Sequence, residues 1–176
     1  MRLKILAASL LAAGAMSAIA ASSPVVKSGE AAPKPAPKAG QVALTPETMK
    51  WGPPPAGLPV GAQAAALEGD PSKSGFFAVR LKMEAGYKIM PHWHPMTERI
   101  TVIAGALYLG MGDHYDADRL TAYPAGSYIV MPKGMHHYAL ARGVTEVQLA
   151  TMGPWGINYI DKANDPRTLS SVKAPK

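Results

Sequence analysis

The sequence predicts an all-β domain, built as an antiparallel barrel or sandwich. Short apolar or alternating runs recur along the chain, and turns rich in glycine and proline separate them. Beyond an N-terminal apolar run, no segment repeats its apolar residues with the period of a helix. This combination favours packed strands over a helical or mixed architecture. A length of 176 residues suits one such domain.

The first 43 residues precede this domain. Arg2 and Lys4 are followed by an apolar run at residues 5–19 and by the small-x-small sequence 18–20. This pattern is typical of a secretory signal peptide, so we expect residues 1–20 to be cleaved and the mature protein to be periplasmic or secreted. No integral membrane span would remain after cleavage, whereas an uncleaved N-terminal anchor is the alternative. Residues 21–43, rich in proline, alanine and lysine, predict a disordered linker.

The charge distribution excludes one large class of partner. The chain carries a formal charge of +6, but five of its 18 basic residues and one of its 12 acidic residues precede Gln41. The remaining chain is therefore near neutral, at +2, and lacks the concentrated basic patch that nucleic-acid binding requires. The chain also has no cysteine, so disulfides cannot stabilise the domain.

The predicted domain begins with an irregular arm. Residues 44–60 contain too many prolines for a central strand, and we expect them to lie across the barrel, pinned by Trp51. A first strand is expected at residues 62–67, followed by a turn at 68–72. The clearest strand comes next, because apolar and mainly polar residues alternate over it. Its apolar positions are Phe77, Val79, Leu81 and Met83.

The later strands follow from the same reasoning. Residues 87–94 form a strand, and residues 98–109 are interrupted by Gly105, which predicts a tight hairpin or a bend between two strands. Residues 110–121 predict a loop, 127–131 a strand and 132–134 a turn. Residues 136–141 and 144–151 predict a hairpin, and 154–160 a last strand. The barrel would thus occupy residues 44–163, leaving 164–176 as a flexible tail.

Candidate metal ligands lie in two separate stretches. His92 and His94 point to one face of an extended strand, because side chains alternate there. Glu98 shares their parity and can join them if the strand resumes after Pro95. A third imidazole comes from residues 126–137. Imidazole and carboxylate ligands suit a divalent transition metal.

Both stretches resemble the two conserved motifs of the cupin superfamily. The first motif matches at every spacing, through Gly86, His92, His94, Glu98 and Gly105. The second matches through Gly126, Pro132, Gly134 and His137, whereas Ala141 replaces its closing asparagine. The resemblance covers residues 62–160 and is greatest to small secreted single-domain cupins.

The resemblance implies a jelly-roll barrel and one metal ion, Fe, Mn, Cu, Zn or Ni. The implied ligands are His92, His94, Glu98 and His137, and Glu98 would otherwise serve as a base. We expect a metal-dependent oxidoreductase, of the dioxygenase or oxidase kind, acting on a small oxygenated or sugar-like molecule. A non-catalytic metal-binding or sensor module and a metal-dependent isomerase or lyase are the alternatives. A storage role is disfavoured, because storage members usually lose ligands. The resemblance also implies a homodimer.

Other residues near the motifs have weaker cases. His136 and His137 cannot both face inward on a strand, and the motif spacing selects His137. Trp93 either packs or covers the site, and His114 is expected to be an exposed loop residue. One tyrosine near the metal is plausible, and a methionine could favour Cu(I), although methionine usually fills the core. The tyrosines are Tyr87, Tyr108, Tyr123, Tyr128 and Tyr138, and the methionines Met90, Met96, Met111, Met131 and Met135. The loop acids Asp113, Asp116 and Asp118 lack calcium-loop spacing.

Overall fold

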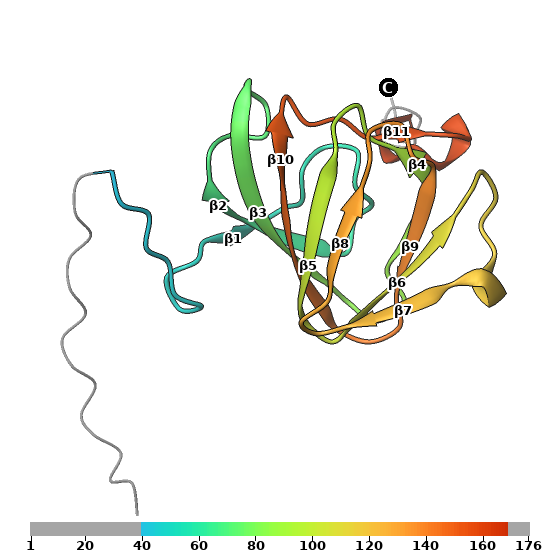
Figure 1. Cartoon of the computed structure of the whole chain (residues 1–176), viewed down its shortest axis with the longest axis horizontal. Helices are drawn as coiled ribbons and strands as arrows, with labels where there is room; N and C mark the ends of the chain where they lie inside the picture. The colour runs from blue at the N-terminus through green and yellow to red at the C-terminus, as the bar shows by residue number, and fades with distance from the viewer. Residues whose placement is uncertain (1–39, 169–176) are drawn as a thin grey trace, which may run out of the picture. The chain divides into compact units, whose positions relative to one another are not determined.

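Two antiparallel sheets face each other in the computed structural model, which describes residues 40–168 (Figure 1). The six-stranded sheet has the order β1-β2-β3-β10-β5-β8, and the five-stranded sheet the order β11-β4-β9-β6-β7. The predicted all-β jelly-roll fold is confirmed. The expected signal peptide, linker residues 21–39 and tail residues 169–176 lie outside the described residues.

Residues 40–168 contain eleven strands and two short 3-10 helices, and residues 166–168 are helical as well. In the six-stranded sheet these are β1 (Trp51–Gly52), β2 (Ala62–Glu68), β3 (Gly75–Met83), β10 (Thr145–Gly153), β5 (Glu98–Ala104) and β8 (Tyr128–Met131). In the five-stranded sheet they are β11 (Asn158–Tyr159), β4 (Lys88–Trp93), β9 (His137–Ala141), β6 (Ala106–Met111) and β7 (Thr121–Pro124). The 3-10 helices are η1 (Ala117–Arg119) and η2 (Lys162–Asn164). The described residues contain no helix with the length and hydropathy that a membrane crossing would require.

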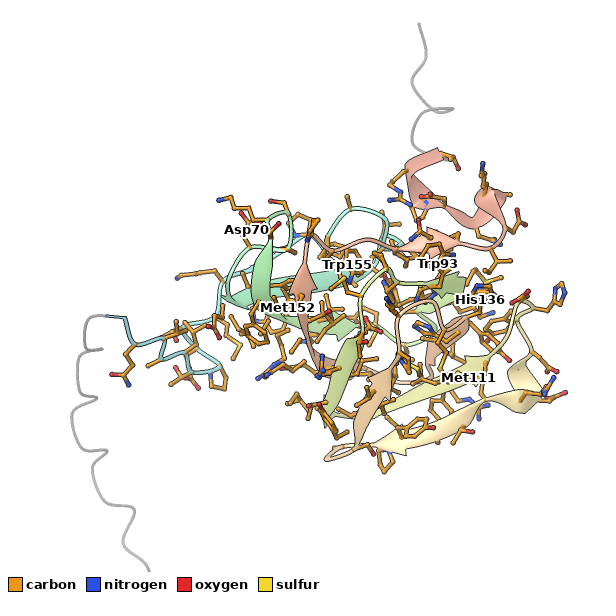
Figure 2. The ribbon with its side chains drawn as sticks, turned by 45° about the horizontal axis from the view of Figure 1, so that its top comes forward. Asp70, Trp93, Met111, His136, Met152 and Trp155 are labelled. Atoms are coloured by element: carbon orange, nitrogen blue, oxygen red, sulfur yellow. The ribbon has the colours of Figure 1, made fainter. Side chains whose placement is uncertain are left out.

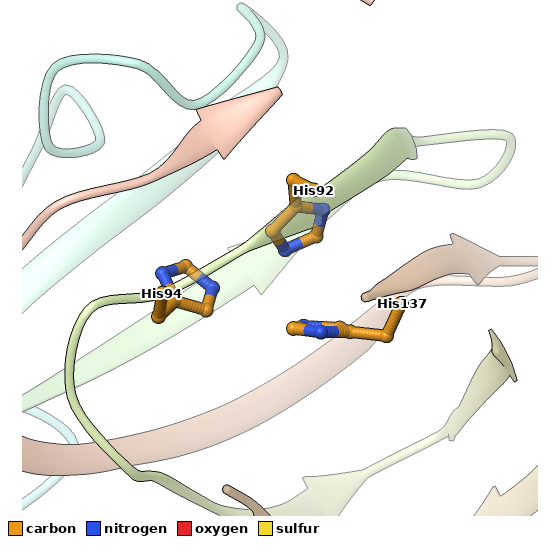
Figure 3. A group of neighbouring side chains, drawn as sticks. All are labelled: His92, His94 and His137. Atoms are coloured by element: carbon orange, nitrogen blue, oxygen red, sulfur yellow. The ribbon is translucent and has the colours of Figure 1, made fainter. Parts of the chain in front are cut away.

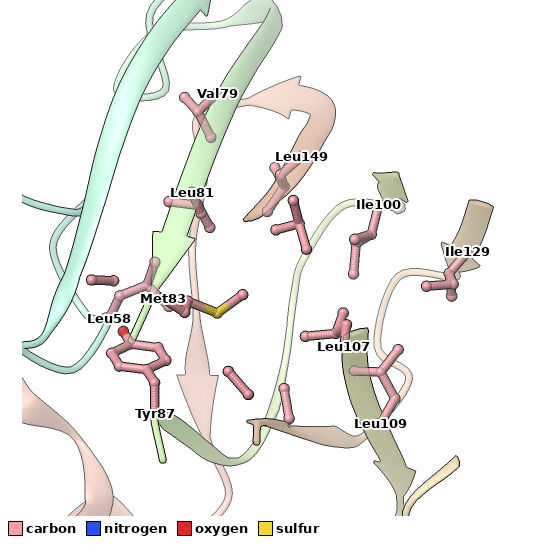
Figure 4. Close-up of a cluster of buried hydrophobic side chains, with 14 of the residues drawn as sticks. Leu58, Val79, Leu81, Met83, Tyr87, Ile100, Leu107, Leu109, Ile129 and Leu149 are labelled. Atoms are coloured by element: carbon pink, nitrogen blue, oxygen red, sulfur yellow. The ribbon is translucent and has the colours of Figure 1, made fainter. Parts of the chain in front are cut away.

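Side chains from both inner faces form one apolar core (Figure 4). On β3 the predicted alternation holds, because Phe77, Val79, Leu81 and Met83 are all buried. Leu107 and Leu109 of β6 meet them from the opposite sheet. Burial of large apolar side chains is the main stabilising term for such a cysteine-free domain, at roughly 1.5–3 kcal/mol for each one.

The connections between strands repeatedly cross from one sheet to the other. Gly105, with φ of +71°, separates β5 from β6, and these strands belong to different sheets. Of the two possibilities, Gly105 is therefore a bend and not a tight hairpin. The expected hairpin of residues 136–141 with 144–151 is wrong for the same reason: β9 pairs with β4 and β6, whereas β10 pairs with β3 and β5. Inner-face packing, not the short turn, selects the partners.

Three further expectations on strands need correction. Trp51 and Gly52, expected in an irregular arm, pair with β2 as a two-residue edge strand. The expected loop 110–121 is shorter at both ends. Strand β6 extends to Met111, and Thr121 already belongs to β7. Strand β7 ends in Pro124, which an edge strand tolerates because no neighbour needs its missing N–H. The last strand comprises Asn158 and Tyr159 alone, because these are the residues that pair with β4.

Candidate metal centre

Three buried imidazoles converge at one end of the core (Figure 3). His92 belongs to β4, His94 follows β4 directly, and His137 begins β9. His92 and His137 are cross-strand partners, so their side chains point to the same face of the sheet. One ligand atom from each of the three histidines lies within 4.8 Å of the others. Segments 43 residues apart thus bring their imidazoles around a common centre.

Glu98 reaches these imidazoles from the opposite sheet. It is the first residue of β5 and is 4 % exposed. Its carboxylate oxygens lie 3.6 Å from Nε2 of His94 and 3.6 Å from Nε2 of His137. The expectation that Glu98 lies near the histidines matches this geometry, but the reason given for it was wrong. The strand of His92 does not resume after Pro95; the chain instead crosses to the six-stranded sheet.

Backbone carbonyls determine which imidazole nitrogen faces the centre. Nδ1 of His92 lies 2.7 Å from the carbonyl oxygen of Met90, and Nδ1 of His137 lies 3.0 Å from that of Met135. Nδ1 of His94 lies 2.7 Å from the carbonyl oxygen of Gly156. A carbonyl can only accept, so each Nδ1 carries a proton, and in the neutral form of each ring Nε2 presents the lone pair. Hydrogen bonds from Nδ1 to backbone carbonyls commonly orient histidines that bind a metal through Nε2.

The electrostatics of the cluster favour a cation at its centre. Burial lowers the pKa of His92 well below its ordinary value, and the neighbouring His137 and His94 lower it further. Burial by itself raises the pKa of Glu98, but positive charge on His94 and His137 outweighs this effect, so the net shift of the pKa is downward. The site therefore combines a neutral imidazole with a buried carboxylate that stays ionised. Such a carboxylate is costly without a cation.

An apolar cavity of about 40 Å³ opens beside these four residues. Their polar groups occupy its wall together with aliphatic core side chains and Trp155. The aliphatic wall residues are Leu58, Leu81, Met83, Ile89, Ile100, Leu107, Leu109, Ala139, Val147 and Leu149. Because one water needs roughly 10–15 Å³ of such volume, the space suits a metal ion and a very small ligand.

The remaining histidines lie outside the cluster. His136 is half-buried, and its Nδ1 lies 2.6 Å from Oδ1 of Asp113. His114 is exposed in the loop after β6. The side chain of Asp116 caps η1 by accepting a hydrogen bond from the backbone of Asp118, which is a structural role. These loop residues therefore do not contribute to the three-histidine centre.

The aromatic and thioether candidates are also placed. Tyr87 and Tyr138 donate hydrogen bonds to the carbonyls of Pro59 and Asp116 and do not line the cavity. None of the five candidate methionines lines the cavity either, although Met96 lines a smaller hollow beside it. Met83 is the methionine that reaches the cavity wall. Trp93 is half-buried and absent from both linings.

Sequence reasoning missed the segment after β10. The Trp155 ring lies 5.4 Å from the His94 ring at an interplanar angle of 31°, and Trp155 lines the cavity. Gly156 supplies the carbonyl that holds His94, and the Tyr159 ring lies 5.9 Å from the His92 ring. A strand was expected over residues 154–160, but residues 154–157 are irregular, and Trp155 within them lines the cavity. The glycines around Trp155 were the available signal.

The comparison with protein families agrees with this geometry. The family described as the ChrR cupin-like domain matches residues 39–155, which include both histidine stretches. The chain belongs to the ChrR cupin-like family. No curated protein matches the sequence of this cupin.

Solved structures resemble this cupin at low sequence identity. The polyketide cyclase RemF from Streptomyces resistomycificus superposes with a TM-score of 0.58 and 17% identity, over 73% of this chain and 92% of the cyclase. An RmlC-like cupin from Shewanella frigidimarina gives a TM-score of 0.48 and 16% identity, over 62% and 87% of the two chains. Salicylate 1,2-dioxygenase from Pseudoaminobacter salicylatoxidans gives 0.46 and 15%, over 59% and 31%. At 17% identity, the likeness to the cyclase shows the fold alone.

Proposed function

We propose that this cupin holds one divalent transition metal and uses it in an oxidoreductase reaction on a small, mainly apolar molecule that carries oxygen. The observation that supports this most directly is the convergence of three buried imidazoles, each with Nδ1 held by a backbone carbonyl. Three neutral nitrogens and a carboxylate form a donor set that suits Fe, Mn, Cu, Ni or Zn. The described residues therefore fit the ion that the family resemblance implies.

Each of the four residues would have a defined part in the reaction. His92, His94 and His137 would hold the ion through Nε2. Glu98 would either complete the ligand set or accept a substrate proton on one of its carboxylate oxygens, because its lowered pKa keeps it ionised. When bound, the ion would supply Lewis acidity and, in a redox-active form, electrons for dioxygen chemistry. The aliphatic wall would exclude bulk water.

The cavity wall also narrows the substrate class. A sugar carries several hydroxyl groups, and each would need a hydrogen-bond partner once buried. Outside the three histidines and Glu98, the wall offers aliphatic side chains and Trp155. We therefore favour a small carbonyl or carboxyl compound with an apolar body over a sugar-like substrate.

Oxygen uptake tests the enzymatic proposal. The protein would be purified with its native metal and incubated with short-chain carbonyl and carboxyl compounds, and with sugars in parallel. We expect dioxygen consumption with a member of the first group and none with His137→Ala. Absence of product across the panel with Fe, Mn and Cu forms would contradict the enzymatic proposal.

The small cavity favours a second candidate, a module that binds metal or a small ligand without turnover. A volume of about 40 Å³ is narrow for a substrate but sufficient for an ion and its water. This alternative predicts stoichiometric metal with a silent substrate panel. The same experiment therefore separates the two functions.

Location and assembly are further proposals. The N-terminal sequence supports a periplasmic or secreted protein, which cell fractionation and the N-terminal mass of the purified protein would test. A homodimer is supported by Ile103 of β5 and by Tyr128 and Val130 of the edge strand β8, which are 39 %, 62 % and 46 % exposed. These apolar side chains would lose water contact in a self-complementary interface. Light scattering that finds a monomer at micromolar concentration would contradict this assembly.

A further inference from the structure

The indole nitrogen of Trp155 is a buried hydrogen-bond donor that lacks a partner. Within the described residues, Nε1 has no hydrogen-bond partner in the protein, and the atom is almost fully buried. A buried tryptophan N–H usually finds a partner, because leaving it unsatisfied costs about 1–3 kcal/mol. The native protein should therefore contain an acceptor for this group.

The backbone on both sides of the ring places Trp155 beside the metal centre. The backbone N–H of Trp155 donates a hydrogen bond to the carbonyl of Pro71 at 2.7 Å. The carbonyl of the next residue, Gly156, accepts a hydrogen bond from Nδ1 of His94. The ring contacts His94 and lines both the main cavity and the smaller hollow that adjoins it. The residue that carries the unpaired donor thus belongs to the wall of the site.

Nε of Arg80 is a second buried nitrogen without a partner among the described residues, and its surroundings differ from those of the Trp155 indole. Nη1 and Nη2 of the same guanidinium contact Glu146 and Gln148. Arg80 lies on β3 and does not line the cavity, so its charge is already compensated by protein groups. The side chain of Trp155 has a single polar atom, and Trp155 lines the cavity.

We propose that Trp155 Nε1–H donates a hydrogen bond to an oxygen atom of the ligand that occupies this cavity. The inference rests on the metal-dependent function above and specifies its ligand class. The ligand carries a carboxylate or carbonyl oxygen that reaches the indole, and its remaining atoms are apolar because the rest of the wall is aliphatic. Trp155 is thereby a specificity-determining residue that selects for an oxygen acceptor.

Formate is a suitable probe, because it carries two carboxylate oxygens in three heavy atoms. Its affinity for the metal-loaded protein would be measured by calorimetry in the wild type, in Trp155→Phe and in Trp93→Phe. We expect the dissociation constant to rise about 10-fold in Trp155→Phe, through loss of one charge-assisted hydrogen bond. Trp93→Phe is the matched control, because Trp93 is a half-buried tryptophan outside the cavity lining, and it should bind as the wild type does.

A spectroscopic readout separates a hydrogen bond from a change in packing. In the zinc-loaded protein labelled with ¹⁵N, the indole N–H signal that disappears in Trp155→Phe should move downfield on formate addition. Equal formate affinity in Trp155→Phe, an unmoved indole signal, or no formate binding to a metal-loaded wild type would each overturn the inference. Metal analysis of the wild type separates the two proposals. A wild type that binds no metal would refute the proposed metal-dependent function, whatever the role of Trp155.

Discussion

At the scale of single residues, the chemistry depends on how protons are distributed among neighbouring side chains. Each of the three clustered histidines donates a hydrogen bond from Nδ1–H to a backbone carbonyl, so in the neutral ring the Nε2 lone pair is available to a metal ion. His136, the neighbour of His137, instead pairs with Asp113 at the edge of the barrel. Adjacent histidines thus have different tasks, because successive side chains on an extended strand face opposite sides.

This contrast supplies a paired mutational test. We expect His137→Ala to lose stoichiometric metal, because it removes one of three converging nitrogens. His136→Ala should keep the metal and should cost at most about 1 kcal/mol of stability, because its ion pair is solvent-exposed. Elemental analysis and denaturant unfolding of both purified variants check this prediction. Full metal occupancy in His137→Ala would be incompatible with the proposed centre.

At the scale of elements, the five-stranded sheet depends on close packing of β6 against β9. Gly110 of β6 and Tyr138 of β9 are cross-strand partners, and Tyr138 is fully buried. A Cβ at position 110 would collide with the Tyr138 ring. The strand that carries His137 is therefore positioned in part by the missing side chain of a glycine.

We expect Gly110→Ala to lower the free energy of unfolding by about 1–3 kcal/mol, because overpacking forces the buried ring to move. Gly143→Ala is the control, since a Cβ there meets no atom within 4 Å and its φ is not positive. Chemical denaturation of the two variants measures the difference. Equal stability of both variants would show that Tyr138 can move without cost.

At the scale of the whole domain, the residues of the candidate metal centre come from both sheets. His92 and His137 come from the five-stranded sheet, and Glu98 comes from the six-stranded sheet. The chain has no cysteine, so no disulfide can make this connection. An ion held by these residues would therefore stabilise the folded barrel, because the unfolded chain does not assemble the site.

Removal of the ion should accordingly lower the melting temperature. A free metal concentration about 1,000 times the dissociation constant contributes about 4 kcal/mol, which corresponds to a shift on the order of 10 °C for a domain of this size. Scanning calorimetry before and after chelation measures the shift, and restored metal should reverse it. An unchanged melting temperature in a verified metal-free form would contradict the cross-sheet role.

The sequence by itself determined the fold class and the residues that gather at the centre, whereas the tertiary structure decided how the strands are paired. Period-two alternation is a local property, and the site residues match the two cupin motifs, so both were readable without coordinates. Partner choice is not local: β9 and β10 look like a hairpin but join different sheets, and Glu98 meets His94 from across the barrel. Trp155 was missed for the same reason, because its position at the cavity depends on hydrogen bonds to Pro71 and from His94 to Gly156, which are remote in sequence. Burial of both inner faces selects these long-range contacts, and no short window of sequence contains them.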